Sequence, residues 1–243
     1  MATTAGISTR DRIISDHKFY RRWAIGIALF IILAFIQFSA RGYVDIPAVP
    51  IWVHVHALVF VGWLALFVAQ NLLAERGALA LHRRLGWAGA VLATAMVGLG
   101  MFTGIRAIEM GRQPPFFTPP FFLALTQFGM LVFAGIVVAA LALRRRTDWH
   151  RRLMLCATVL LLEPAFGRVL PMPLTGQELG EAMIMVIQLA VIGFAALHDR
   201  KLHGALHPAL LWGAATIVVG HAGVSLLART PAVIALADSL APA

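Results

Sequence analysis

The sequence predicts an all-α protein, a polytopic bundle of about seven transmembrane helices with the N-terminus in the cytoplasm and the C-terminus outside. Of its 243 residues, 60% are hydrophobic and 13% are charged, and the mean hydropathy is +0.84. Soluble domains are about half apolar and about a quarter charged. The apolar residues also gather into blocks of about twenty, the length that crosses a hydrocarbon core. A soluble protein is excluded, and the lipid bilayer is the expected partner.

The apolar blocks form one domain. The predicted spans are 23–40, 51–74, 87–105, 121–143, 153–170, 181–197 and 208–228. A basic cytoplasmic segment at 1–22 precedes them, and a short tail at 229–243 follows. No small-residue cleavage site follows the polar and basic start, so the first block is predicted to be a retained span. The tail, which contains Pro231, is predicted to be either a short surface helix or disordered.

The positive charges indicate the orientation. The net charge is +9, and most of the 20 Lys and Arg residues lie in four segments, at 10–22, 76–84, 144–152 and 200–201. All four are cytoplasmic if the N-terminus is. This positive-inside pattern supports an odd number of spans. In a membrane protein, basic residues placed in this way indicate orientation and no nucleic-acid partner.

A four-residue motif, HRRL, occurs twice. It appears in LHRRLGW (81–87) and in WHRRLML (149–155), each time at the predicted cytoplasmic start of a span. His82 and His150 are therefore either ligands or part of two basic helix ends, because Arg anchors helices at the inner interface. The other two outward-going spans also follow histidines that stand beside basic residues: His17, His198, His203 and His207. That recurrence favours the anchoring interpretation.

Three more histidines lie within the spans. His54 and His56 point about 200° apart on a helix, so they cannot share one partner. His56, Trp63 and Gln70 follow at seven-residue spacing and form one stripe, which places Gln70 in the predicted polar core. We therefore expect His56 to face inward and His54 to lie near the outer interface. His221 in the last span is predicted to lie in the same outer layer as His56.

The fifth and sixth predicted spans carry further polar residues. Glu163 precedes Pro164, which is expected to kink its helix because proline frees a backbone carbonyl. Arg168 lies about 140° around the helix from Glu163, so the two are expected to pair only loosely. With Gln188 in the sixth span, these are candidate site residues, because polar groups within a membrane are costly and usually functional. The single cysteine, Cys156, is predicted to be a small core residue.

The histidines form two predicted layers, one near each face of the bilayer. The outer layer contains His54, His56 and His221 with Arg168 close in depth, and the inner layer contains His82, His150 and His198 with His203 and His207 on the adjoining loop. Paired histidines on different helices are how a membrane b-type cytochrome holds haem, through neutral imidazole nitrogens. An arginine in the same layer can bond a haem propionate.

Three other interpretations stay open. Intramembrane polar side chains can simply bond one another between helices. The second is a non-haem metal site, for which His54, His198, His203 and His207 are the candidate ligands. The three histidines at the inner end would place a metal oxidoreductase at the cytoplasmic face, because histidine-rich loops hold transition metals. The third is a transporter or small-molecule sensor with a midplane polar site made by Glu163, Arg168 and Gln188.

Three stretches resemble known membrane proteins. HVHALVFVGWLALFVAQ, LHRRLGW and DWHRRLML are similar to segments of an uncharacterised bacterial family of multi-pass membrane proteins. To a lesser degree they resemble small histidine-bearing membrane proteins implicated in cytochrome oxidase maturation, in which HRRLM opens a span. The resemblance covers roughly residues 50–170. It implies a bacterial inner-membrane setting and a link to haem or copper, with His56, His82 and His150 as the matching positions.

The leading expectation is an inner-membrane protein that binds haem b or another metal cofactor, for electron transfer or for assembly of a respiratory oxidase. His56 and His221 are the expected outer ligands, and His82 and His150 are the inner ones. Respiratory-chain proteins or quinone are the expected partners besides the bilayer.

Overall fold

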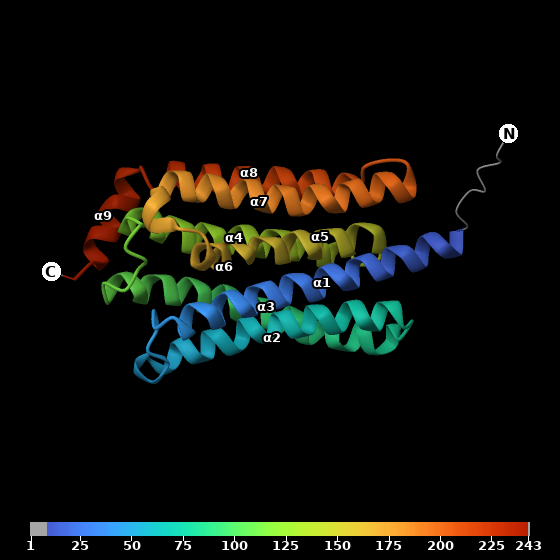
Figure 1. Cartoon of the computed structure of the whole chain (residues 1–243), viewed down its shortest axis with the longest axis horizontal. Coiled ribbons are helices and arrows are strands. Elements are labelled where there is room, and N and C mark those ends of the chain that lie inside the picture. The colour runs from blue at the N-terminus through green and yellow to red at the C-terminus, as the bar shows by residue number, and fades with distance from the viewer. Residues whose placement is uncertain (1–8, 243) are drawn as a thin grey trace.

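The computed structural model describes residues 9–242, and all regular structure in that range is helical (Figure 1). Residues 1–8 of the predicted N-terminal segment, and residue 243, lie outside it. The helices are α1 (Thr9–Ala40), η1 (Ile46–Ala48), α2 (Ile51–Glu75), α3 (Leu79–Glu109), α4 (Pro119–Ala142), α5 (Thr147–Leu160), α6 (Leu162–Val169), α7 (Met172–His203), α8 (Pro208–Leu227) and α9 (Pro231–Leu240). The all-α prediction is confirmed for the described residues.

Six of these helices are long and apolar enough to cross a membrane: α1, α2, α3, α4, α7 and α8. Their outer faces carry large apolar side chains, and Leu58, Val91 and Val186 are each more than half exposed. Contiguous apolar surface of this kind is rare on soluble monomers, whereas in a bilayer it contacts lipid. The architecture is that of a multi-pass membrane protein.

The predicted fifth span, 153–170, is not one continuous helix. α5 ends at Leu160, α6 begins at Leu162, and neither is long enough to cross a bilayer alone. α1 begins at one end of the bundle and α9 lies at the other (Figure 1). Six passages would return the chain to its starting end, so α5 and α6 together make one further passage along the bundle. The number of membrane crossings and the orientation of the termini stay predictions.

The break between α5 and α6 follows from Pro164. A helical proline has no N–H to donate to the carbonyl four residues earlier, which here belongs to Leu160. The side-chain Nε2 of Gln188 on α7 replaces it, at 3.4 Å from the carbonyl oxygens of both Val159 and Leu160. A proline is tolerated at membrane depth where such a partner satisfies the freed carbonyl. The kink expected from the sequence is present as a full interruption.

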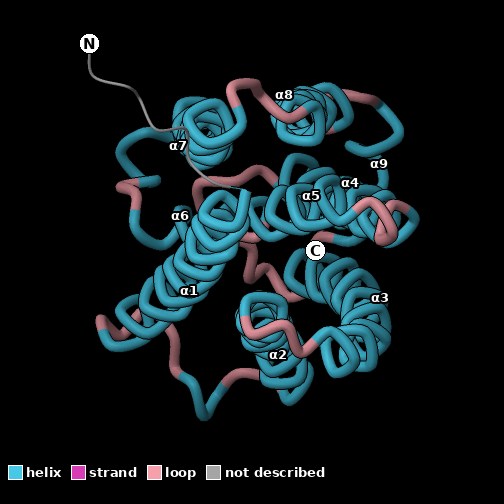
Figure 2. The backbone as a smooth tube through the Cα atoms, turned by 90° about the vertical axis from the view of Figure 1, so that its right-hand side faces the viewer, coloured by secondary structure: helices cyan, strands magenta, loops and turns pink. Residues whose placement is uncertain are grey.

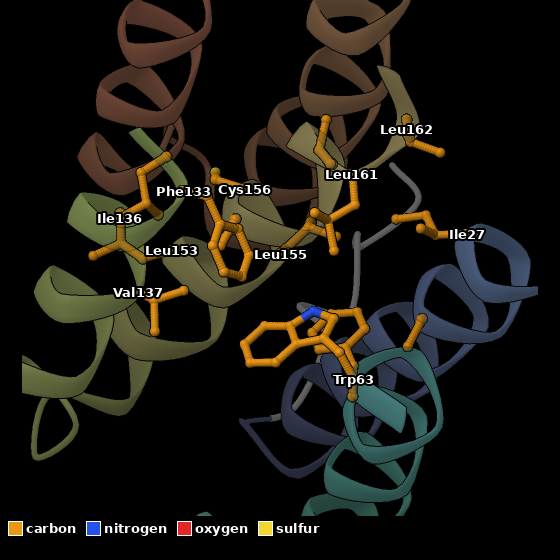
Figure 3. Packing of buried hydrophobic residues seen from close by; sticks show 14 of the residues in the cluster. Ile27, Trp63, Phe133, Ile136, Val137, Leu153, Leu155, Cys156, Leu161 and Leu162 are labelled. Carbon is orange, nitrogen blue, oxygen red and sulfur yellow. The ribbon is translucent and has the colours of Figure 1, made fainter. Parts of the chain in front are cut away.

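α4 and α5 run through the middle of the bundle, with α1, α2 and α3 on one side and α7 and α8 on the other (Figure 2). The ring of Trp63 on α2 meets that of Phe133 on α4 edge to face, with centroids 5.4 Å apart (Figure 3). Leu155 and Cys156 of α5 are fully buried in the same core. Cys156 is thus a small core residue, as predicted.

The predicted C-terminal tail contains a helix, α9, so of the two alternatives the short helix is the one observed. The Thr230 hydroxyl caps it by accepting from the backbone N–H of Val233. Ala237 is fully buried against Ile108 of α3 and Leu123 of α4. The tail therefore closes one end of the bundle.

The approach of α8 to α5 depends on a glycine. A Cβ atom at Gly213 would lie 2.2 Å from Sγ and 2.9 Å from Cβ of Cys156. Gly213→Ala should therefore lower the free energy of unfolding by about 1–3 kcal/mol, the cost of overpacking, measured by SDS-induced unfolding in detergent micelles.

Gly193→Ala on α7 is the matched control, because a Cβ atom there meets nothing within 4 Å. Adding Cys156→Ala to Gly213→Ala should restore part of the lost stability. An unchanged unfolding midpoint for Gly213→Ala would show that the two helices are not packed this closely.

Candidate functional site

Both HRRL histidines lie at one end of the bundle, the end at which α1 begins. This end also carries the start of α3, the start of α5 and the turn between α7 and α8 (Figure 1). The ring centroids of His82 on α3 and His150 on α5 are 6.4 Å apart, with the ring planes at 89°. The fold thus joins two motifs that are far apart in the sequence, and we call these two residues the histidine pair.

Each ring of the histidine pair is held by a backbone carbonyl. Nδ1 of His82 lies 3.3 Å from the oxygen of Gln70, and Nδ1 of His150 lies 2.8 Å from that of Ala140. A carbonyl only accepts hydrogen bonds, so Nδ1 is the donor in both rings. In the neutral imidazole the lone pair is then on Nε2. An Nδ1–H bond to a carbonyl is also the common outer-shell contact of metal-binding histidines.

Gln70, one of the predicted polar-core residues, positions the first ring from α2. Its side-chain Nε2 donates to the backbone oxygen of His82 at 3.1 Å, while its own carbonyl accepts from the ring. Its Oε1 is buried without a hydrogen-bond partner in the described part of the chain. Gln70 therefore fixes the start of α3 against the end of α2.

A second polar group at the same end is centred on Asp16 of α1, which is 3% exposed. Its carboxylate is ion-paired with Arg151 of α5 and lies 3.1 Å from Nε2 of both His198 and His203 on α7. The ring of His198 also stacks on Phe19, with centroids 3.9 Å apart. These contacts tie α1, α5 and α7 together.

The adjoining ion pair is buried more deeply. The Nε and Nη2 atoms of Arg152 donate to the two carboxylate oxygens of Asp199 at 2.7 and 2.6 Å, and both side chains are almost fully buried. Bidentate pairing of this kind compensates two buried charges. Nearby, His207 bonds Asp148 at 3.0 Å and also caps α8. Together with the contacts of Asp16, these pairs form what we call the Asp16 network.

Three atoms of this network are close enough to hold a metal ion. A carboxylate oxygen of Asp16, one of Asp199 and a ring nitrogen of His203 all lie within 4.8 Å of one another. Each carboxylate already faces an arginine, Arg151 or Arg152, so a cation would have to displace a matched charge. The geometry therefore permits a metal ion, whereas the charge balance favours an ion-pair network.

The predicted outer ligands are not brought together. His56 of α2 stacks on Phe60, with centroids 4.2 Å apart, and lies 3.2 Å from the Thr103 hydroxyl on α3. His221 belongs to α8, which lies on the opposite side of α4 from α2 in both views (Figures 1 and 2). Counting residues along a helix gives depth but not position around the bundle, so the expected pairing of His56 with His221 is absent. His54 is exposed, as its angular offset from His56 predicts.

A third polar group lies inside the bundle where α5 is broken. His221 Nε2 is 3.0 Å from Oε1 of Gln188, and His221 Nδ1 is 3.3 Å from Oε2 of Glu181 on α7. Gln188 and Glu181 are both buried. Glu163 of α6 lies close enough to Glu181 for the two carboxyl groups to interact electrostatically. We call these four residues the Glu181 cluster.

Arg168, predicted to bind a haem propionate or a transported substrate, faces elsewhere. Its guanidinium donates to the carbonyl oxygen of Pro164 at 2.7 Å and lies 4.0 Å from the ring centroid of Phe35. Its own carbonyl accepts from Nε2 of Gln37 at 2.9 Å. Arg168 thus joins α6 to α1, and its guanidinium is directed to α1 and not into the Glu181 cluster.

Two residues at the centres of these groups, Asp16 and Glu181, are not among the residues that the sequence singled out as a site. Asp16 stands directly before the basic stretch HKFYRR, and Glu181 opens the apolar part of α7. An acid at the start of an apolar span needs a partner from another helix if it is buried. That position is the signal by which they could have been found.

No family model, curated protein or solved structure matches this chain. The resemblance noted from the motifs accordingly stays an expectation. Function is inferred from the histidine pair, the Asp16 network and the Glu181 cluster.

If the Arg152–Asp199 pair holds the end of the bundle together, removing one partner should destabilise the protein more than replacing both partners with apolar residues. Asp199→Leu should lower the free energy of unfolding by about 3–5 kcal/mol because it leaves the arginine buried and unpaired. Asp199→Leu combined with Arg152→Met should recover most of that loss. SDS-induced unfolding of both variants measures the difference, and equal losses would contradict a buried pair.

Proposed function

We propose that this protein binds haem b at the end of the bundle where α1 begins, with His82 and His150 as axial ligands. The observation that carries the proposal is the 6.4 Å between their ring centroids, combined with the carbonyl bond at each Nδ1. An imidazole nitrogen binds a metal at about 2 Å and lies about 1 Å from its own ring centre, so two imidazoles on opposite sides of one metal have centroids about 6 Å apart. The spacing of the histidine pair fits that value.

Haem suits this donor set better than a bare ion does. Haem iron takes its remaining axial ligands from the protein, whereas a bare zinc or copper ion needs three or four protein ligands. Within residues 9–242, the one candidate group of three metal-binding side chains does not include His82 or His150. Two imidazoles without a third metal-binding side chain beside them among the described residues match the two-histidine ligation of a b-type haem.

The first HRRL motif also offers free cations for the haem propionates. Arg83 and Arg84 are exposed and form no ion pair among the described residues. A guanidinium bonds a carboxylate with two parallel hydrogen bonds. The corresponding arginines of the second motif, Arg151 and Arg152, are instead engaged in the Asp16 network.

A single haem near one face narrows the role that we propose. Haem supplies one-electron chemistry when bound. Electron transfer across the whole bilayer would need a second haem, and His56 and His221 do not face each other. The proposal is therefore electron exchange with a respiratory-chain protein or quinone at the cytoplasmic face of a bacterial inner membrane, or assembly of a respiratory oxidase there.

A transporter is the second candidate function, and the Glu181 cluster is the observation that favours it. Ionisable groups inside a membrane bundle commonly mark the path of an ion or substrate. Compared with the polar site expected from the sequence, Glu181 and His221 take the place of Arg168 beside Glu163 and Gln188.

His82→Ala and His150→Ala should each remove low-spin haem from the protein. The full-length wild type, purified in detergent and saturated with haem, should show a Soret band with sharp reduced α and β bands. Each variant should lose the haem or become high-spin, because one axial ligand is gone. His54→Ala should keep the wild-type spectrum, because His54 is exposed and lies on a different helix from both ligands.

Metal analysis of the same samples separates the alternatives. A low-spin spectrum retained in both variants would contradict the assignment, as would a folded wild-type protein that takes up no haem. Copper or zinc bound without haem, and lost in His203→Ala, would support a metal ion in the Asp16 network.

A further inference from the structure

The Glu181 cluster contains a buried carboxyl group that lacks hydrogen bonds. The Glu181 side chain is 9% exposed, and neither of its oxygens has a hydrogen-bond partner among residues 9–242. Nδ1 of His221 approaches Oε2 at 3.3 Å without completing an aligned bond. A buried carboxylate without partners is costly, so this arrangement needs either a bound cation or a proton.

The hydrogen bonds around His221 fix where its protons lie. Nε2 of Gln188 donates to the carbonyl oxygens of Val159 and Leu160, so the amide must present Oε1 to His221. Because that oxygen only accepts, Nε2 of His221 carries a proton. In the neutral ring, Nδ1 is then an unprotonated base that faces Glu181.

We propose that Glu181 and His221 form a proton-binding site inside the bundle. A proton on Oε2 of Glu181, donated toward Nδ1 of His221, completes the missing hydrogen bond. Uptake forms one O–H bond on Glu181 and breaks one O–H bond in the hydronium ion that donates the proton. The site does not depend on haem, because none of its residues belongs to the histidine pair.

Most other charged groups near α7 are already engaged. α7 packs against α5, α6 and α8, and near its end it also meets α1, where Asp16 is paired with Arg151 and contacts His198 and His203. Arg200 and Lys201 lie in the last turn of α7, at the opposite end of the helix from Glu181. On α6, Arg168 donates to the carbonyl oxygen of Pro164. On α5, the ionisable side chains lie at the far end of the bundle, where Arg151, Arg152, Asp148 and His150 each have a partner. On α7 itself, Glu178 is paired with the exposed Arg229, and Asp199 is paired with Arg152. On α8, His221 is the one ionisable side chain. His221 is therefore the base that Glu181 meets.

A proton fits this cluster better than a metal cation. Sodium, potassium, magnesium and calcium prefer several oxygen ligands. Here the amide oxygen of Gln188 is already occupied by His221, and the atom facing Glu181 is an imidazole nitrogen. Among the described residues, no group of three potential metal ligands includes members of the cluster.

The cluster also touches the interrupted crossing. Gln188 bonds both to His221 and to the carbonyl that Pro164 leaves free, so the proton site and the α5–α6 break share one hydrogen-bond chain. Proton binding at Glu181 would therefore act next to the interruption between α5 and α6. In a proton-coupled transporter, a protonatable group at this position could change the conformation of the interrupted passage.

Infrared spectroscopy of the full-length protein in detergent tests the proposal. As the pH is raised from mildly acidic to alkaline, a carboxylic C=O stretch should lose intensity, and its frequency should drop when water is replaced by D₂O. Glu181→Gln should remove that band. Glu178→Gln on the same helix should leave it unchanged, because the Glu178 side chain is 80% exposed.

His221→Asn provides an independent readout if Glu181→Gln does not fold. This variant removes the base at Nδ1, so the C=O band should move to a higher frequency as its hydrogen bond is lost. A band that is unchanged in both variants would overturn the proposal, and so would the absence of any titrating band in the folded wild type. A response to sodium or potassium at constant pH would overturn it in favour of a metal cation. Retention of the band in His82→Ala is expected, which keeps this test separate from that of haem binding.

Discussion

The structure depends on one constraint: inside a bilayer, every buried polar group must find its partner within the bundle. A helix satisfies this constraint for its own backbone N–H and C=O groups. Pro164 has no N–H, so it leaves the carbonyl group of Leu160 without its helical hydrogen bond. Gln188 restores that hydrogen bond from a neighbouring helix, and His221 in turn bonds Gln188. These hydrogen bonds link α7 and α8 to the interrupted α5–α6 passage. Glu181 lies beyond His221 at the end of this series of hydrogen bonds, and its carboxyl oxygens have no hydrogen-bond partner among the described residues.

The same constraint explains why the arginines of the two HRRL motifs make different contacts. In the second copy, Arg151 and Arg152 neutralise Asp16 and Asp199, which closes the end of the bundle. In the first copy, the two arginines are exposed and have no ion-pair partner among the described residues. The histidines of both copies are held by carbonyls and meet. The same four residues therefore make different contacts in the two copies because their surroundings differ.

Much of the fold follows from the sequence, because apolar length and 3.6-residue periodicity are local properties. They predict the long helices, the outward position of His54 and the kink at Pro164. They do not predict neighbours: residue counting places His221 and His56 at one depth, yet α4 separates their helices. Asp16 also escapes a local analysis, since its burial comes from α5 and α7 closing over it. The meeting of His82 with His150 needed both helix starts to converge, which residue spacing alone does not determine.

The most direct test of the account is the haem stoichiometry and electron paramagnetic resonance spectrum of the oxidised full-length protein. We expect one haem per chain with the low-spin ferric signal of two imidazole ligands, because the structure assembles one histidine pair among its described residues. Two haems per chain would contradict it, since the second would require an outer pair such as His56 and His221. A folded protein that binds no haem would leave the histidine pair as a structural contact between α3 and α5.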